Sequence, residues 1–430
     1  MSQSVPAPEA APSHKEAHTS LADYRTALTT PGSRAAAAAS VLARLPIAMI
    51  GISAMLYVQR ETGSFADAGI VSASLLVGVS LGAVGQGRLI DRFGPTRPLL
   101  LTTLLFAIAV TGLVIAIEAH APIATLIALG ATSGLTQPTV GSASRALWTR
   151  LLPPGGARNA AFSYEAISME VFFILGPGFA GLLIAAPWPG TGIVTGTVAM
   201  IVGATAFALT PTVRAWGASA SPAGRLLGAL ESPGMRTLAL AALGFGAVIG
   251  FVEVAVPAAA TEAGHASIGG VLLSAWSLSS VAFGVVYSLR PWPRQLGLRL
   301  PVLLGGFGAL VALLALPSSL WGLAVAMLLA GALITPQSTT HSATIELVAP
   351  QGTAAEAFGW VLTSVTLGLA AGQSISGSLV EHVGTWAAFV AAAIAGVAIA
   401  ALLWLLRGTV RPPSARSAKI ETTELVGAAR

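Results

Sequence analysis

The sequence predicts an all-α membrane protein in which twelve helices cross a lipid bilayer. Hydrophobic residues make up 54% of the 430-residue chain, and charged residues make up only 9%. A soluble domain carries about 25% charged residues, so most of the surface of this chain is suited to lipid and not to water. The mean hydropathy of +0.80 agrees, and long apolar segments recur along most of the chain.

A helix needs about 20 mostly apolar residues to cross a bilayer, and twelve segments meet this requirement. The third and fourth segments are loosely separated and the ninth is short, so a count of eleven stays open. In chain order, the predicted spans are 35–57, 67–87, 98–117, 122–144, 160–185, 191–213, 237–259, 267–289, 301–316, 319–345, 357–380 and 385–406.

Polar segments divide these spans into two groups of six. Residues 1–33 are rich in Ala, Pro, Ser and Thr and are predicted to form a disordered cytoplasmic tail. A first bundle of six spans follows over 34–213, then a basic cytoplasmic linker over 214–236 and a second bundle over 237–407. Residues 408–430 are predicted to form a second cytoplasmic tail.

The basic residues fix the expected orientation. If the N-terminus lies in the cytoplasm, all of the 22 Lys and Arg residues except Arg44 and Arg60 fall on the cytoplasmic side. This asymmetry follows the positive-inside rule and predicts a multi-pass protein of the plasma (inner) membrane with both termini in the cytoplasm. It also explains the sequence pI of about 10.2 without a nucleic-acid partner.

The two groups of spans are expected to be copies of one design. Gly87 and Gly284, at the inner ends of the second and eighth spans, are 197 residues apart. The fourth and tenth spans carry Gln–Pro pairs at a similar offset, Gln137-Pro138 and Pro336-Gln337. Parallel six-helix halves of this kind place a substrate site at their interface near the membrane midplane.

The segment between the second and third spans carries the clearest motif. It reads Gly-Arg-Leu-Ile-Asp-Arg-Phe-Gly-Pro-Thr-Arg and resembles the signature loop of the major facilitator superfamily, Gly-x-x-x-Asp-Arg-x-Gly-x-x-Arg. Five defining positions match, namely Gly87, Asp91, Arg92, Gly94 and Arg97. The resemblance implies the fold of that family, with twelve transmembrane helices in two pseudo-symmetric six-helix bundles.

The same resemblance implies that this loop is part of a gate. Asp91 is expected near the N-terminus of the eleventh span, where the positive end of the helix dipole favours a carboxylate. Gly87 is expected to allow close helix approach and Gly94 to support a tight turn. The alternative is a loop whose arginines serve only membrane topology.

A second resemblance concerns the direction of transport. Gly176, Pro177 and Gly181 in the fifth span look like part of the motif of exporters in this superfamily, although Phe172 stands where that motif has a glycine. Pro177 is expected to bend the helix and the glycines to allow tight packing, which a bent, packed helix without export would also need. Gly130 stands where many proton-coupled exporters have an arginine, so coupling through that arginine is not expected.

Charged and polar residues inside the spans are candidates for the transport site, because a charge in the bilayer centre costs about 2.5–3.5 kcal/mol or more. Arg44 and Glu170 are expected to face the cavity and pair, whereas Glu165 is expected to be solvated near the inner surface. The alternative is that Arg44 and Glu170 form a permanent structural ion pair. The remaining candidates are Glu253, which could instead be an outer-rim residue, and Gln137, Gln337 and His341, of which His341 could instead be a hydrogen-bonded helix residue.

The sequence predicts a secondary transporter that moves a small molecule by alternating access, with proton-coupled efflux as the first hypothesis. A metabolite uptake symporter and a non-transporting receptor or scaffold are the alternatives. No catalytic motif indicates an enzyme, and the absence of cysteine and the scattered histidines predict no metal site and no cofactor. The expected partners are a lipophilic or cationic small molecule, protons and lipid, and the chain is expected to be a monomer.

Overall fold

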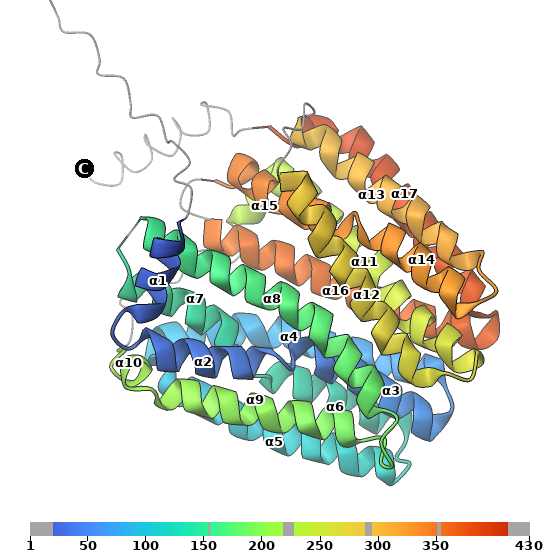
Figure 1. Ribbon diagram of the computed structural model, residues 1–430, viewed down its shortest axis with the longest axis horizontal. Coiled ribbons are helices and arrows are strands. Elements are labelled where there is room, and N and C mark those ends of the chain that lie inside the picture. Colours follow the sequence, from blue (N-terminus) through green and yellow to red (C-terminus); the bar gives the residue numbers. More distant parts are fainter. Residues whose placement is uncertain (1–19, 154, 218–227, 289–294, 351–353, 412–430) are drawn as a thin grey trace, which may run out of the picture.

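The structure, a computed structural model, describes residues 20–153, 155–217, 228–288, 295–350 and 354–411. The described residues form helices and no strands, which confirms the all-α fold class. Within some helices a few side chains are not described, among them those of Asp91 and Glu170. Figure 1 shows long helices running side by side, the first half of the chain in blue to green and the second half in yellow to red.

The first half contains ten helices, of which the longest ones match predicted spans. They are α1 (Leu21–Thr29), α2 (Ser33–Arg44), α3 (Ile47–Thr62), α4 (Phe65–Phe93), α5 (Thr96–Glu118), α6 (Ile123–Thr136), α7 (Val140–Leu151), α8 (Gly156–Leu183), α9 (Thr191–Leu209) and the short α10 (Pro211–Arg214).

The described part of the second half contains seven α-helices. They are α11 (Pro233–Glu262), α12 (Ala266–Ser288), α13 (Leu296–Ala312), α14 (Leu320–Gly331), α15 (Ile334–Val348), α16 (Ala354–His382) and α17 (Thr385–Leu406).

Eleven helical stretches in the described residues are long and apolar enough to cross a membrane. The predicted fourth span is not among them, because it is two half-helices, α6 and α7, separated at Gln137–Thr139. The predicted first and tenth spans are also interrupted, between α2 and α3 and between α14 and α15. Two of these breaks coincide with Pro46 and Pro138, since proline lacks a backbone N–H and cannot continue the hydrogen-bond ladder.

The predicted tail over residues 1–33 is wrong for its last part. Ser20 begins α1 with a capping box, in which its hydroxyl accepts from the backbone N–H of Asp23 while the Asp23 carboxylate accepts from the backbone N–H of Ser20. The Asp23 carboxylate also accepts from the Ser20 hydroxyl at 2.7 Å, and this bond, followed by the one from the Ser20 backbone N–H, holds the pKa of Asp23 below its ordinary value. Ala27 of α1 is buried in an apolar cluster with Trp148 of α7 and Ala161 of α8. These residues lie near the ends of α7 and α8 that are predicted to face the cytoplasm, so apolar contact with them orders α1.

The two halves meet along two helix pairs, α4 with α16 and α8 with α12. We call the end where α4 and α12 begin the outer end, following the predicted orientation, and the opposite end the inner end. A Cβ added to Gly69 would lie 2.5 Å from the carbonyl oxygen of Gln373, and one added to Gly181 would lie 2.8 Å from the Cα of Gly270. The backbones therefore touch at the outer end, which only glycine permits.

Two glycines of the signature loop behave differently. Gly94 has φ = 76° between α4 and α5 and lies against the carbonyl oxygen of Trp216, so the predicted tight turn is confirmed. Gly87 has open space where a Cβ would be, so the prediction that it allows close helix approach is wrong for this structure.

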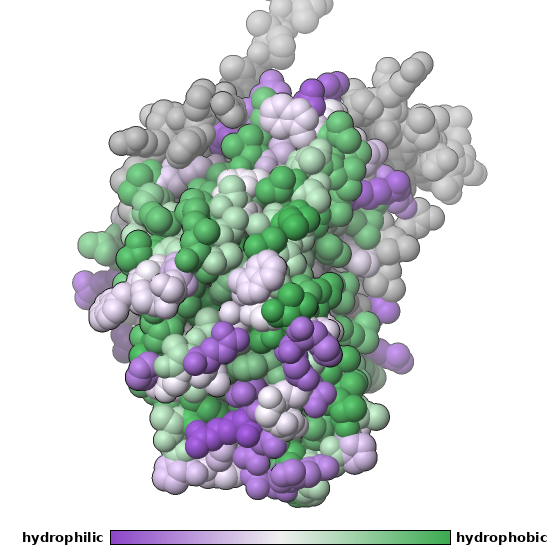
Figure 2. Space-filling view, turned by 90° about the vertical axis from the view of Figure 1, so that its right-hand side faces the viewer, coloured by the Kyte–Doolittle hydropathy of each residue, from purple (hydrophilic) through white to green (hydrophobic). Residues whose placement is uncertain are grey.

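The surface suits a lipid environment. Large apolar side chains such as Ile108, Leu182, Leu278 and Leu405 are exposed on the long helices. Figure 2, which looks at the end of the molecule on the right of Figure 1, shows hydrophobic residues over much of the visible face and hydrophilic residues gathered in its lower part. Apolar exposure on this scale is expected where lipid replaces water.

Candidate functional site

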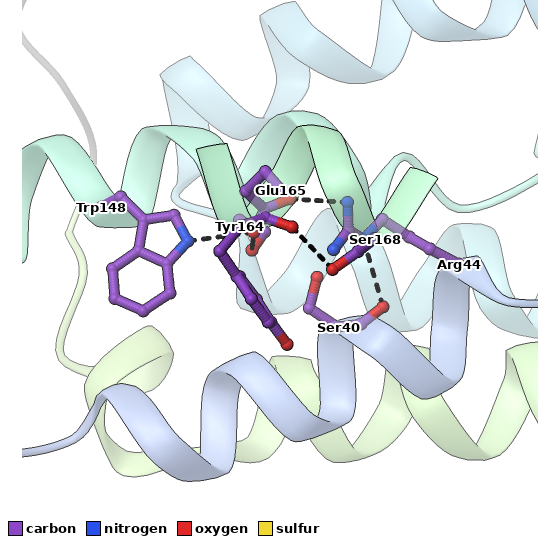
Figure 3. A network of polar contacts seen from close by, with 7 residues as sticks. Ser40, Arg44, Trp148, Tyr164, Glu165 and Ser168 are labelled. Carbon is purple, nitrogen blue, oxygen red and sulfur yellow. Dashed lines mark hydrogen bonds and ion pairs between the residues drawn. The ribbon is translucent and has the colours of Figure 1, made fainter. Parts of the chain in front are cut away.

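A buried ion pair lies in the first half of the chain. The Nη1 of Arg44 lies 2.6 Å from Oε2 of Glu165, and the two side chains are 2% and 0% exposed. Trp148 Nε1–H and the Ser144 hydroxyl both donate to Oε1 of Glu165, at 2.9 Å and 2.7 Å. Figure 3 shows this group, which we call the Arg44–Glu165 cluster, between α2, α7 and α8.

Local sequence explains how the cluster is assembled. Arg44 is the last residue of α2, directly before the break at Pro46. Ser144 and Trp148 are four residues apart on α7 and therefore share one helix face. Gly141 lies one turn earlier, and a Cβ there would approach Arg44 Cδ to 3.3 Å, so the small residue leaves room for the arginine stem.

The structure corrects the predicted partner of Arg44. The acid that pairs with it is Glu165, which was expected to be solvated, and the side chain of Glu170 lies outside the described residues. The predicted fifth span begins at residue 160, whereas α8 begins at Gly156. At 1.5 Å per residue, Glu165 is therefore about 14 Å along the helix.

Phe172 covers the other side of the arginine. The guanidinium carbon of Arg44 lies 5.6 Å from the centre of the Phe172 ring, a cation–π distance. Phe172 is the residue that replaces a glycine of the exporter motif. The departure from that motif therefore supplies a contact to the buried charge.

The cluster is incompletely satisfied. Arg44 Nη2 and the Ser40 hydroxyl are buried and have no hydrogen-bond partner, while Arg44 Nε donates to the Ser40 carbonyl at 3.3 Å. Burying an ion costs several kcal/mol, and a purely structural pair offsets this only when its remaining donors are satisfied. Arg44 Nη2 and the Ser40 hydroxyl therefore remain able to form further hydrogen bonds.

Gln86 of α4, which sequence analysis did not single out, bridges the break between α6 and α7. Its Nε2 donates to the carbonyls of Leu135 and Gln137 at 3.1 and 2.9 Å, and its Oε1 accepts from the Thr139 backbone N–H at 3.1 Å. The side-chain amide thereby replaces the hydrogen bonds that Pro138 interrupts. An amide in an apolar span opposite a proline-containing span was the signal available in the sequence.

The second half repeats this arrangement. The Ser280 hydroxyl of α12 accepts from the backbone N–H of Thr335 at 3.1 Å, beside the break between α14 and α15. In both halves a polar side chain from one helix satisfies the interrupted helix next to it. The Gln137 side chain is only half-buried, and its backbone carbonyl is the group that Gln86 holds.

Gln337 and His341 lie together inside the second half. Gln337 Nε2 and His341 Nε2 are 3.0 Å apart, and both residues are buried. The His341 ring meets Phe245 edge-on, with 5.6 Å between ring centres. This packing favours the interpretation of His341 as a hydrogen-bonded helix residue.

Glu253 is partly exposed on α11, and its Oε2 accepts a hydrogen bond of 2.8 Å from Gln373 Nε2 of α16. The predicted candidates therefore fall at separate places: the Arg44–Glu165 cluster, the Gln86 bridge, the Gln337–His341 pair and the Glu253–Gln373 pair. In the described part of the chain, no three His, Asp or Glu residues could hold a metal ion together.

The gating motif is described only in part. Arg92 and Arg97 are exposed, and Arg92 lies over the Phe93 ring at 5.2 Å. The Asp91 side chain and the residues 351–353 before α16 lie outside the described residues, so the predicted contact between them stays a prediction.

Comparison with known proteins identifies the kind of chain. A family model described as Major Facilitator Superfamily matches residues 36–294, which is more than half of the chain. A protein of Bacillus subtilis (strain 168), described as putative metabolite transport protein YwtG, is 32% identical over 124 residues, which are 28% of this chain and 26% of that protein. The chain thus matches about a quarter of the length of this curated relative.

Solved structures share the fold. The nucleoside transporter NupG superimposes with a TM-score of 0.71 at 14% identity, over 86% of this chain and 99% of that chain. A POT family transporter in complex with a thioalcohol-conjugated peptide gives 0.65 at 14% identity, over 88% and 96% of the two chains.

The Gln86 bridge makes a testable prediction. Gln86→Leu leaves two carbonyls and one N–H unsatisfied in an apolar surrounding, so we expect it to destabilise the purified protein by about 2–5 kcal/mol, measured by unfolding in detergent. Gln137→Leu keeps the backbone carbonyl that Gln86 holds and is the matched control. Equal stability of the two variants would contradict the assigned role.

Proposed function

The chain belongs to the major facilitator superfamily, and from this premise we propose that it is a secondary transporter that moves a small molecule out of the cell by alternating access, driven by protons. The family fold and the multi-pass helical architecture support transport. The proposal adds twelve crossings, in which α6 and α7 together count as one, a monomer in the plasma (inner) membrane, and cytoplasmic termini, as the basic residues predict.

The Arg44–Glu165 cluster is the observation that carries the proposed coupling. When Glu165 is ionised, Arg44 of α2 and the Ser144 and Trp148 donors of α7 hold it. A proton bound at Oε2 removes the charge and weakens the ion pair. Because α7 is joined to α6 only through the break that Gln86 bridges, the change can move α7 without unfolding the span.

Alternating access also needs contacts between the halves that can open. Glu381 near the end of α16 accepts hydrogen bonds from the Ala66 backbone N–H, at 2.9 Å, and from the Ser64 hydroxyl at the start of α4. A carboxylate at a helix N-terminus is stabilised by the helix dipole. We call this contact the outer latch, since it joins the two halves beside the glycine contact of Gly69.

The resemblance of Gly176, Pro177 and Gly181 to the exporter motif is what favours export, and the segment that carries it lies between the halves. Gly178 and Gly181 of α8 lie against Ser274 and Gly270 of α12, where a Cβ would come within 2.8 Å of the other helix. The segment thus joins the two halves at the outer end through a second helix pair, α8 with α12. Metabolite uptake by symport is the second candidate, which the description of the Bacillus subtilis relative favours.

Inside-out membrane vesicles test the direction and the coupling. With an acid lumen, an exporter accumulates at least one compound from a panel of lipophilic, cationic and metabolite probes. Accumulation with an alkaline lumen would indicate uptake by symport in the cell, and no accumulation under either gradient would indicate a receptor or scaffold.

Glu165→Gln tests the coupling residue in the same vesicles. We expect it to reduce gradient-driven accumulation by about 5- to 150-fold, because the side chain can no longer bind and release a proton, while the amount of protein in the membrane stays normal. Glu346→Gln, which changes an exposed acid of α15, should leave accumulation unchanged. Full activity of Glu165→Gln would remove Glu165 from the mechanism.

The outer latch makes a separate prediction, which the lack of cysteine makes easy to measure. Ser72 is 1% exposed and lies one turn inward of Gly69, so a Ser72→Cys reporter should react slowly with a membrane-impermeant maleimide added outside. Glu381→Gln should raise its labelling rate by about 2- to 5-fold, because the outer end opens more often.

Glu262→Gln is the matched control, since Glu262 bonds Thr385 within the second half. An unchanged rate in Glu381→Gln would show that the contact does not hold the outer end closed.

A further inference from the structure

Glu253, which is partly exposed, and Gln373, which is buried, form a group of hydrogen-bond acceptors at the boundary between the halves. The Gln373 amide donates from Nε2 to Glu253 Oε2 at 2.8 Å, and this fixes the orientation of the amide when Glu253 is ionised, because an ionised carboxylate can only accept. The Gln373 Oε1 is then left without any hydrogen-bond partner, although Gln373 is 4% exposed. From the amide dimensions, this oxygen lies within about 5 Å of Glu253 Oε2.

No positive group balances these acceptors. Within the described residues the structure records one ion pair, Arg44 with Glu165, and none at Glu253. The neighbours of Glu253 on its helix are apolar, including Phe251, Val252 and Val254. A carboxylate beside an amide oxygen in such surroundings offers acceptors to a group that carries positive charge and donates hydrogen bonds, and such a group stabilises it without protonation of the acid.

We propose that Glu253 and Gln373 bind the primary ammonium group of the transported molecule. An ammonium group has one positive charge and three N–H donors, which matches a carboxylate beside an unpartnered amide oxygen. Glu253 is partly exposed, so it can be reached, whereas Glu165 is fully enclosed by its own partners. The inference rests on the proposed transport function and names the chemical class of its substrate.

The position of the pair on α16 connects it to the closing of the outer end. Gln373, Gly377 and Glu381 are spaced by four residues and share one face of the helix. Along this face, the Gln373 carbonyl touches Gly69, Gly377 packs on Phe65, and Glu381 forms the outer latch on α4. An ammonium group held at Gln373 therefore acts on the helix face that joins the halves.

Close contacts between α11 and α16 keep the site preformed. The Ser376 hydroxyl donates to the Phe251 carbonyl at 2.9 Å, and a Cβ at Gly250 would lie 2.9 Å from the Gln373 backbone nitrogen. The two helices are thus locked in register where the acceptors lie, which positions both oxygens before any ligand arrives.

Equilibrium binding to the purified full chain tests the proposal. The probe is radiolabelled phenethylammonium, compared with its N-trimethyl analogue, which has the charge but no N–H donors, and with phenethyl alcohol, which has no charge. We expect the primary ammonium to bind best. Glu253→Gln should weaken its binding by about 10- to 100-fold, and Gln373→Leu should weaken it by a smaller factor.

Further variants keep the test sharp if Glu253→Gln fails to fold. Gln373→Glu places a second carboxylate beside Glu253 and should strengthen ammonium binding. Glu262→Gln changes the last residue of α11, the helix that carries Glu253, and should leave ammonium binding unchanged. Sodium should not displace the probe, and displacement would assign the site to an inorganic cation and overturn the proposal.

Unchanged binding in Glu253→Gln, equal binding of the alcohol, or no binding of the ammonium to the wild type would each overturn the proposal. Because binding needs no gradient, the result is independent of the proposed proton-driven export. Binding that depends on Glu253, without transport in vesicles, would instead overturn the proposed function alone.

Discussion

The absence of water from the bilayer core is the constraint on which the rest of this structure depends. A backbone or side-chain polar group at membrane depth has to find its partner within the protein, because lipid offers none. The chain nevertheless interrupts three of its spans. At two of these breaks a neighbouring helix supplies the partner: Gln86 at the break at Pro138, and Ser280 at the one before Thr335. These side chains allow half-helices to exist, and half-helices such as α7 can change position without exposing bare backbone to lipid.

Composition and periodicity were sufficient to predict the fold, because the lipid requirement acts on every span and leaves a signal about 20 residues long. The signature loop then identified the family, which the family match over residues 36–294 confirms. Which residues pair at the site could not be predicted in the same way, because that depends on the residue at which each helix begins. An error of four residues in the start of α8 exchanged Glu165 for Glu170 as the partner of Arg44. The helix α1 escaped prediction because a nine-residue segment with little apolar character is ordered mainly by contact with α7 and α8.

Glycine positions divide into those that bring helices together and those that do not, and sequence could not separate them. Gly69 and Gly181 let the two halves touch at the outer end, whereas Gly87 has open space beside it. The difference lies in which face each glycine presents, and that depends on how the two bundles are placed against one another. The internal duplication predicts six helices per half, but it does not predict where one half meets the other.

The two halves differ in which buried groups lack a hydrogen-bond partner. Among the described residues of the first half these are Arg44 Nη2, three hydroxyls (Ser40, Ser53 and Thr197) and Glu165 Oε2, which is ion-paired with Arg44. In the second half they are the Gln337 and Gln373 amide oxygens, which can only accept. A bundle selected for stability alone would remove both, because each unsatisfied group costs about 1–3 kcal/mol. In the proposed mechanism, a proton on Glu165 weakens the charge pairing in the first half, and an ammonium group binds at Glu253 and Gln373 in the second. Glu165 lies on α8 and Gln373 on α16, and both helices meet the opposite half. The proposal therefore links the binding of one positive group to the release of another through the interface between the halves, as antiport requires.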